Sequence, residues 1–144
     1  MRNGLGGNIF LLDKLFIPIN HPGVHWALVC VFVQAKAIYY YDSLGEGGRT
    51  VVSAIHQYLE EEHMRKYKKG LPKGWRLIPD TPCPRQDNGN DCGVYICMFM
   101  DYLSLGRPLD VTHITPDEVS SGYRKHIAAS IIRGALPVNI DNYM

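Results

Sequence analysis

The chain has 144 residues, of which 46% are hydrophobic and 20% are charged. This length and composition fit one globular domain with a core of moderate size. Fifteen basic and 14 acidic residues give a net charge of +1, so the totals favour neither nucleic acid nor an anionic membrane as a partner.

Apolar runs such as Trp26–Val33 are far shorter than the about 20 residues that a membrane span needs, and no charged region with an apolar signal core opens the chain. We therefore expect an intracellular monomer of the nucleus or cytoplasm. The four cysteines include no Cys-x-x-Cys pair, so we expect no disulfide framework, no zinc or other metal, and no cofactor. These cysteines are Cys30, Cys83, Cys92 and Cys97.

The first third of the sequence predicts strands. Residues 1–8 are rich in Gly and Asn and should be loose. Phe10–Ile19 reads as a buried strand that ends in a proline-containing turn, and residues 23–33 read as a central strand. Ala37–Tyr41 predicts a second strand, which ends in a turn sequence beginning at Asp42. An antiparallel hairpin of the last two strands would bring His25 close to Asp42.

The remaining elements are mainly helical. Residues 50–67 have apolar positions at helical spacing and predict an amphipathic surface helix with a basic C-terminus. Residues 75–79 predict a short strand. A buried helix should begin at Cys92 and run to Leu105. The sequence Thr115-Pro116-Asp117-Glu118 predicts a capping box, followed by an apolar i, i+4 line through Val119, Tyr123, Ile127 and Ile131 to a stop near Gly134 and Pro137.

The stretch before the buried helix indicates chemistry. A loop of Asn, Asp and Gly residues delivers Cys92 to the first turn of that helix, where backbone N–H groups and the helix dipole stabilise a thiolate. A capped core helix that starts with Cys by chance is the alternative reading of this stretch.

A cysteine hydrolase also needs an imidazole, a group that orients it, and donors for the oxyanion. His25 would pair with Cys92 and act as general acid, Asp42 would orient His25, and the Gln86 amide with the backbone N–H of Cys92 would bind the oxyanion. Gly93 would let a substrate backbone approach the helix. Taken singly, His25, Asp42 and Gln86 can equally be turn and loop residues.

Together, three ordered blocks resemble the ubiquitin-like-protein-specific cysteine proteases, the SUMO (sentrin) protease family. The blocks are His25-Trp26, residues 40–45 and residues 86–95, and the similarity extends over residues 10–136. The resemblance implies His25, Asp42 and Cys92 as the catalytic triad and Gln86 as an oxyanion donor. It also implies that Trp26 walls a narrow channel for the Gly-Gly tail of a SUMO-like substrate.

Two features depart from the pattern of that family. The segment that normally precedes the strand at Phe10 is absent, together with a second channel tryptophan that Trp75 cannot be assumed to replace. Arg85 stands where a glutamine is common, which can alter contacts of the loop.

We therefore expect residues 1–144 to form a single, N-terminally shortened catalytic domain. Its fold class should be α+β and papain-like, with the Cys92 helix packed on a mainly antiparallel sheet. The expected activity is cleavage after the Gly-Gly terminus of a ubiquitin-like modifier, SUMO above NEDD8 or ubiquitin. A non-catalytic remnant that binds a ubiquitin-like protein and an acyltransferase on a related fold are the alternatives.

Overall fold

A four-stranded sheet forms the centre of the computed structural model, which describes residues 7–109 and 112–135. Its strands are β1 (Lys14–His21), β2 (His25–Phe32), β3 (Ala37–Tyr41) and β4 (Arg76–Ile78), in the order β1-β2-β3-β4. β1 with β2 and β2 with β3 pair antiparallel, whereas β3 and β4 pair parallel. The predicted mainly antiparallel sheet and its β2–β3 hairpin are confirmed.

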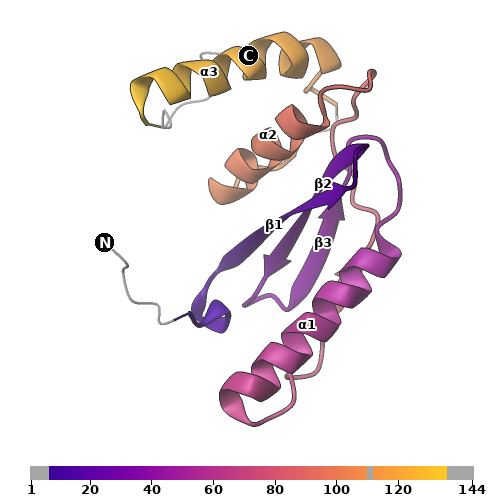
Figure 1. Ribbon diagram of the computed structural model, residues 1–144, viewed down its shortest axis with the longest axis vertical. Helices are drawn as coiled ribbons and strands as arrows, with labels where there is room; N and C mark the ends of the chain where they lie inside the picture. The colour runs from indigo at the N-terminus through magenta and orange to yellow at the C-terminus, as the bar shows by residue number, and fades with distance from the viewer. Residues whose placement is uncertain (1–6, 110–111, 136–144) are drawn as a thin grey trace.

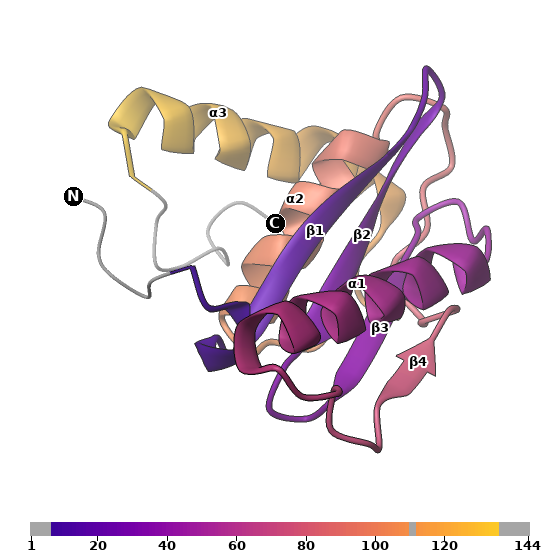
Figure 2. The ribbon, with the colours of Figure 1, turned by 60° about the horizontal axis from the view of Figure 1, so that its bottom comes forward.

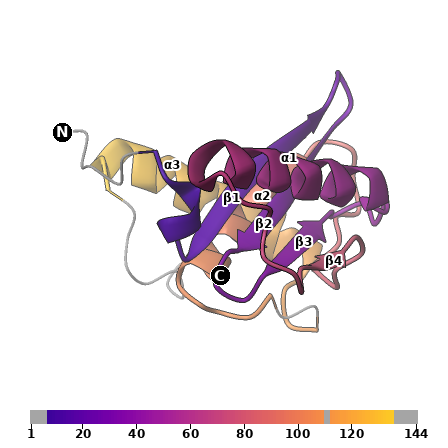
Figure 3. The ribbon, with the colours of Figure 1, turned by 90° about the horizontal axis from the view of Figure 1, so that it is seen from below.

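Helices cover both faces of this sheet. In Figure 1 the layers run from α3 (Arg124–Arg133) at the top through α2 (Cys92–Ser104) and the sheet to α1 (Arg49–Tyr67) at the bottom. Figures 2 and 3 show α1 crossing one face of the sheet while α2 lies behind the other face. The α+β prediction, with the helix that begins at Cys92 packed on the sheet, is thus confirmed.

The alternation of β2 explains why this strand is buried on both sides. Leu28 and Cys30 pack into the core formed with α2, whereas Ala27, Val29 and Val31 pack into the core formed with α1. All five side chains are fully buried. A strand with two covered faces reads as a continuous apolar run, which is the pattern that identified it in the sequence.

The first strand differs from its prediction. Residues 9–11 form a 3₁₀ turn, β1 begins only at Lys14, and the strand passes through Pro18 to His21. β1 is an edge strand, so a proline there can point its missing N–H position away from the neighbouring strand without breaking the ladder. Of the segment predicted to be loose, only Gly7 and Asn8 are described, and Asn8 donates a 2.7 Å hydrogen bond to the Tyr67 hydroxyl.

The predicted capping box is present at the last helical segment. The Glu118 carboxylate accepts from the Thr115 backbone N–H at 2.8 Å, and the Glu118 N–H donates to Thr115 Oγ1 at 3.3 Å. The helix ends at Gly134, whose backbone is left-handed. The predicted stop near Pro137 and the family resemblance to Leu136 reach residues outside the described ones.

The predicted apolar line on that helix runs through two kinds of helix. Residues Glu118–Tyr123 form a π-helical segment, η2, before α3 begins. Tyr123, Ile127 and Ile131 line the same cavity, so the apolar line continues on one face of the helix. Val119 and Tyr123 are fully buried, but Ile131 is 75% exposed. The C-terminal end of this apolar line is therefore left open to solvent.

Candidate active site

His25 opens β2, and Asp42 follows the last residue of β3. Because the two strands are antiparallel, with Leu28 opposite Tyr41, these positions share one end of the sheet. His25 Nε2 and Asp42 Oδ1 are 2.7 Å apart, and both side chains are almost completely buried. The predicted proximity of His25 and Asp42 is therefore present, and the Nδ1 edge of the imidazole remains on the side away from the carboxylate.

Asp42 also shapes the turn that follows β3. Its Oδ1 accepts the backbone N–H of Leu44 at 2.8 Å, and its backbone carbonyl accepts the N–H of Gly45 at 3.1 Å. The Tyr40 hydroxyl donates to Oδ2 at 3.5 Å. The sequence left a turn-forming role and a histidine-orienting role as alternatives for Asp42, and its geometry is compatible with both at once.

Cys92 is the first residue of α2 and is 8% exposed. Figure 1 shows that α2 begins beside the end of the sheet where β2 starts and β3 ends. The first N–H groups of a helix have no partner within the helix, so they can stabilise a negative charge on the thiol. His25 and Cys92 are both described residues, and no hydrogen bond joins them. Such contacts are often long without substrate.

The Gln86 side chain is held by two contacts. Ser43 Oγ donates to Gln86 Oε1 at 2.5 Å, and Gln86 Nε2 donates to the Asn88 carbonyl at 2.5 Å. The Gln86 backbone N–H also donates to the Ser43 carbonyl at 3.0 Å. An amide nitrogen carries two hydrogens, so one N–H of Gln86 can still be offered to an incoming oxygen.

The loop between Gln86 and Cys92 is closed by a carboxylate network. Asp91 Oδ2 accepts from Asn88 Nδ2 at 2.8 Å, and Asp91 Oδ1 accepts from the Arg124 guanidinium on α3. Burial alone would raise the pKa of Asp91, but hydrogen bonds from Asn88 and Ser120 together with Arg124 outweigh it and lower that pKa. The negative charge next to Cys92 is thus directed toward Arg124.

Arg85, the departure noted in the sequence, reaches back to the turn after β3. Its Nη1 donates to the Asp42 carbonyl at 2.5 Å, and its guanidinium occupies the space beside Gly45, where any Cβ would overlap it. The Tyr95 hydroxyl on α2 donates to the Arg85 carbonyl at 2.9 Å. These contacts join the loop that carries Gln86 to the strand end that carries Asp42.

Trp26 and Gly93 are the two predicted substrate contacts. Trp26 follows His25 and is 41% exposed. A Cβ at Gly93 would meet no atom of the chain within 4 Å, so internal packing does not require glycine there. Trp75 precedes Arg76, which pairs with Ala37 at the start of β3, so Trp75 lies at the other end of the sheet from Asp42.

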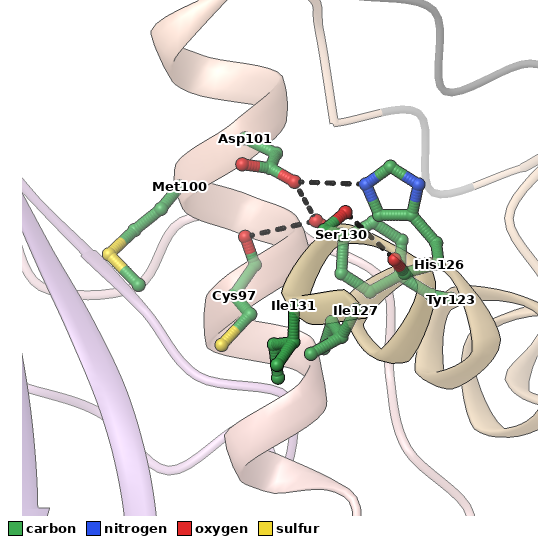
Figure 4. Close-up of a pocket in the computed structure, with 8 residues that line it drawn as sticks. All are labelled: Cys97, Met100, Asp101, Tyr123, His126, Ile127, Ser130 and Ile131. Carbon is green, nitrogen blue, oxygen red and sulfur yellow. Dashed lines mark hydrogen bonds and ion pairs between the residues drawn. The ribbon is translucent and has the colours of Figure 1, made fainter. Parts of the chain in front are cut away.

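A second group of the same residue types lies between α2 and α3, around a cavity of about 360 Å³ (Figure 4). His126 Nε2 is 3.6 Å from Asp101 Oδ2, and the Tyr123 hydroxyl donates to the same carboxylate. In Figure 4 the Cys97 thiol points away from the His126 ring. Burial and, second, Asp101 raise the pKa of Cys97. This group packs two helices together.

Several contributors to the site were not singled out from the sequence. Ser43 fixes the Gln86 amide, Tyr40 contacts Asp42, and Arg124 neutralises Asp91. Tyr40 and Ser43 lie within two residues of Asp42, inside the block of residues 40–45, and that position is the signal that could have found them. Arg124 is 33 residues from Asp91, and no local pattern could connect them.

Within residues 7–109 and 112–135, no three His, Cys, Asp or Glu side chains gather closely enough to hold a metal ion. None of the helices in the described part of the chain has the length and apolarity that crossing a membrane requires.

An α+β domain with a cysteine at the start of its central helix, beside a buried His–Asp pair, defines the class of cysteine-protease-like domains. The chain belongs to the Ulp1 protease family: the model of its C-terminal catalytic domain matches residues 2–135. The resemblance seen in the sequence is thereby confirmed.

Curated relatives agree with this assignment. The chain is 38% identical over 125 residues to ubiquitin-like-specific protease 1 of Saccharomyces cerevisiae, a match that covers 87% of this chain and 19% of that protein. It is 39% identical over 98 residues to a sentrin-specific protease of Caenorhabditis elegans, covering 67% of this chain and 14% of the relative. The chain thus spans less than a fifth of these relatives.

Solved structures share the fold. The C-terminal Ulp1 protease domain in complex with Smt3, the yeast ortholog of SUMO, matches with a TM-score of 0.71 at 37% identity. That match covers 88% of this chain and 55% of the solved chain. The Ulp1-like SUMO protease catalytic domain of Chaetomium thermophilum matches with a TM-score of 0.73 at 25% identity, over 93% of this chain and 51% of the other.

Proposed function

We propose that this chain is a cysteine protease that cleaves the peptide or isopeptide bond after the C-terminal Gly-Gly of a ubiquitin-like modifier, SUMO above NEDD8 or ubiquitin. The observation that carries the proposal is the buried 2.7 Å contact of His25 with Asp42 at the end of the sheet where Cys92 starts α2. The names of the relatives, sentrin-specific and ubiquitin-like-specific proteases, support the class of substrate.

In the first half of the reaction, Cys92 Sγ attacks the carbonyl carbon of the terminal glycine. His25 would stabilise the thiolate through Nδ1, because Asp42 occupies Nε2 and fixes the tautomer and the direction of the ring. The tetrahedral intermediate places its negative oxygen near the helix start. The Cys92 backbone N–H and the Gln86 amide would donate to that oxygen.

In the second half, the C–N bond of the intermediate breaks and His25 gives its proton to the leaving amine. A thioester between Cys92 and the modifier remains. Water, deprotonated by His25, then attacks this thioester, releases the carboxylate of the modifier and restores the thiol. The steps use only side chains and the backbone of this chain and require no cofactor or metal.

Selectivity for diglycine would come from the surroundings of Cys92. Trp26 follows His25 in β2 and is 41% exposed, and Gly93 presents no side chain after the nucleophile. A passage bounded by an indole and bare backbone leaves no space for substrate side chains, so glycine is favoured at both positions. The four cysteines carry free thiols, which fits the reducing nucleus or cytoplasm where we place the chain.

Covalent capture tests this proposal. The purified chain is incubated with SUMO, NEDD8 and ubiquitin that carry a C-terminal electrophile, and intact mass reports the adduct. We expect one adduct per chain with the SUMO probe, and we expect peptide mapping to place it on Cys92. Cys92→Ala should form no adduct, whereas the matched variant Cys97→Ala should react like the parent chain.

Three outcomes would contradict the proposal. An adduct that survives Cys92→Ala would exclude Cys92 as the nucleophile. No adduct with any probe, from a chain that circular dichroism shows to be folded, would favour the non-catalytic binding module. Acetyl transfer from acetyl-CoA without cleavage of a diglycine-tailed substrate would favour the acyltransferase.

A further inference from the structure

A second histidine lies against the proposed catalytic histidine. His21, the last residue of β1, is directly opposite His25 in the antiparallel register. The two imidazole rings are stacked, with centroids 6.2 Å apart and planes inclined by 15°. His25 is buried, and His21 is partly buried. Neither the motif blocks nor the mechanism above uses His21.

His21 is also connected to Asp42 through one hydroxyl. His21 Nε2 and Tyr40 Oη are 3.1 Å apart, and Tyr40 Oη is 3.5 Å from Asp42 Oδ2. A carboxylate only accepts, so the single hydroxyl hydrogen of Tyr40 goes to Asp42. With that hydrogen on Asp42, the Tyr40 oxygen can accept from His21 in the tautomer that carries hydrogen on Nε2.

Tyr40 can serve this connection because it is fixed and neutral. Burial, and secondarily Asp42, raise the pKa of Tyr40 well above its ordinary value, so its hydroxyl keeps its hydrogen. The Tyr40 ring fills the space beside Gly48, where any Cβ would overlap it. The ring is therefore tightly packed. The O–H bond can still rotate about the bond between the ring and the oxygen, and His21 can set its direction.

We propose that His21 is a positioning residue for the reactive centre. By donating from Nε2 to the Tyr40 hydroxyl, it directs that hydroxyl to Asp42 Oδ2. The Asp42 carboxylate is then held by Tyr40 on one oxygen and by His25 and Leu44 on the other. These contacts would fix its orientation toward the His25 ring. The inference rests on the roles proposed above for His25 and Asp42.

The test measures the reactivity of the Cys92 thiol, which requires no modifier protein. Iodoacetamide alkylates the thiolate, and peptide mass spectrometry gives the rate at Cys92 separately from the other cysteines. We expect His21→Leu to lower this rate at pH 6.5 about fivefold, the factor that one ordinary hydrogen bond provides. At pH 9.5 the rates should converge, because a thiol then ionises without help from an imidazole.

Two further variants separate positioning from general damage. His21→Gln keeps an N–H donor that can reach Tyr40 and should restore the rate at pH 6.5 to within about twofold of the parent chain. In a Tyr40→Phe background, His21→Leu should have almost no additional effect, because its connection to Asp42 is already gone. His113→Leu, at an exposed histidine before η2, is the matched control and should react like the parent chain.

Equal rates for His21→Leu and the parent chain at pH 6.5 would overturn the proposal. So would losses in His21→Leu and Tyr40→Phe that multiply in the double variant. The other titratable and charged groups near this corner are His25, Asp42, the Arg85 guanidinium on the Asp42 carbonyl and, more remotely, Glu46, so the pH curve of a Glu46→Gln variant is recorded beside the others. If the His21 effect is found but capture by every modifier probe fails, the positioning role stands and the proposed substrate falls.

Discussion

Two groups of Cys, His and Asp stand out in the described part of the chain, and their cysteines lie on different parts of the same helix, α2. Cys92 starts α2, where N–H groups face outward from the helix end. Cys97 lies inside α2, where those groups are used by the helix itself, and burial raises the pKa of its thiol. Residue types alone would not separate the two groups.

Their His–Asp contacts differ as well. His25 Nε2 meets Asp42 at 2.7 Å with both side chains buried, whereas His126 Nε2 is 3.6 Å from Asp101, a carboxylate that also accepts from Tyr123. In the group at the end of the sheet, His25 lies on a strand and Cys92 on a helix. Position on the fold, more than composition, is therefore the basis on which we propose Cys92, and not Cys97, as the reactive cysteine.

Replacing each of the two cysteines with alanine, one at a time, should give the largest difference between the two groups. We expect Cys92→Ala to lower turnover of a fluorogenic SUMO C-terminal amide by at least about a thousandfold, because no other group can form the thioester. Cys97→Ala should retain turnover within about twofold. Loss of activity in Cys97→Ala with a folded chain would refute the division between the two groups.

The two aspartates should respond in opposite ways. Asp42→Asn is expected to reduce turnover on the order of a thousandfold with little loss of stability, because His25 is then oriented and polarised incorrectly. Asp101→Asn should leave turnover nearly unchanged and lower the free energy of unfolding by about 1–2 kcal/mol. Turnover and urea denaturation of both variants measure this; full activity of Asp42→Asn would assign that residue to the turn alone.

The smallest effect concerns the Asp91–Arg124 contact, which joins α3 to the loop before Cys92. Arg124 is more than half exposed, so Arg124→Gln should cost only about 1 kcal/mol of unfolding free energy at pH 7. The pKa of Asp91 is lowered in the folded chain. The contribution of its charge to the free energy of unfolding is therefore present above the unfolded pKa and is lost as the pH falls through the folded pKa.

Urea denaturation of the parent chain and of Arg124→Gln, each at pH 7 and at about pH 3, measures this pH dependence. The difference in unfolding free energy between the two chains should be smaller at the lower pH. Lys125→Gln removes a charge from the next position of the same helix and should behave like the parent chain at both pH values. A difference that is equal at pH 7 and pH 3 would show that Arg124 acts without the Asp91 charge.

Local patterns predicted those parts of the fold that local physics determines. The apolar run of β2 and the turn after Tyr41 gave the hairpin, and hence the proximity of His25 and Asp42. The change from polar loop to apolar helix placed Cys92 at a helix start. The predicted bounds of an element differ from the observed ones where tertiary structure determines them. β1, for example, passes through Pro18 because it is an edge strand.

Features that depend on pairing register or on distant contacts could not be read from the sequence. His21 faces His25 only because of the β1–β2 register, and Arg124 meets Asp91 only because the last helix folds over the loop. The π-helical turn at Glu118–Tyr123 has no local signature in the apolar spacing.

Site-resolved alkylation of all cysteines at pH 7 tests the central claim most directly. The pKa values of Cys30 and Cys83 are raised by burial to about 12 and about 11, and that of Cys97 is raised as well. A short exposure of the folded chain to iodoacetamide should therefore modify Cys92 first, at least about tenfold faster than Cys97. Equal rates at Cys92 and Cys97, or faster reaction at Cys97, would contradict the assignment of the reactive centre to the start of α2.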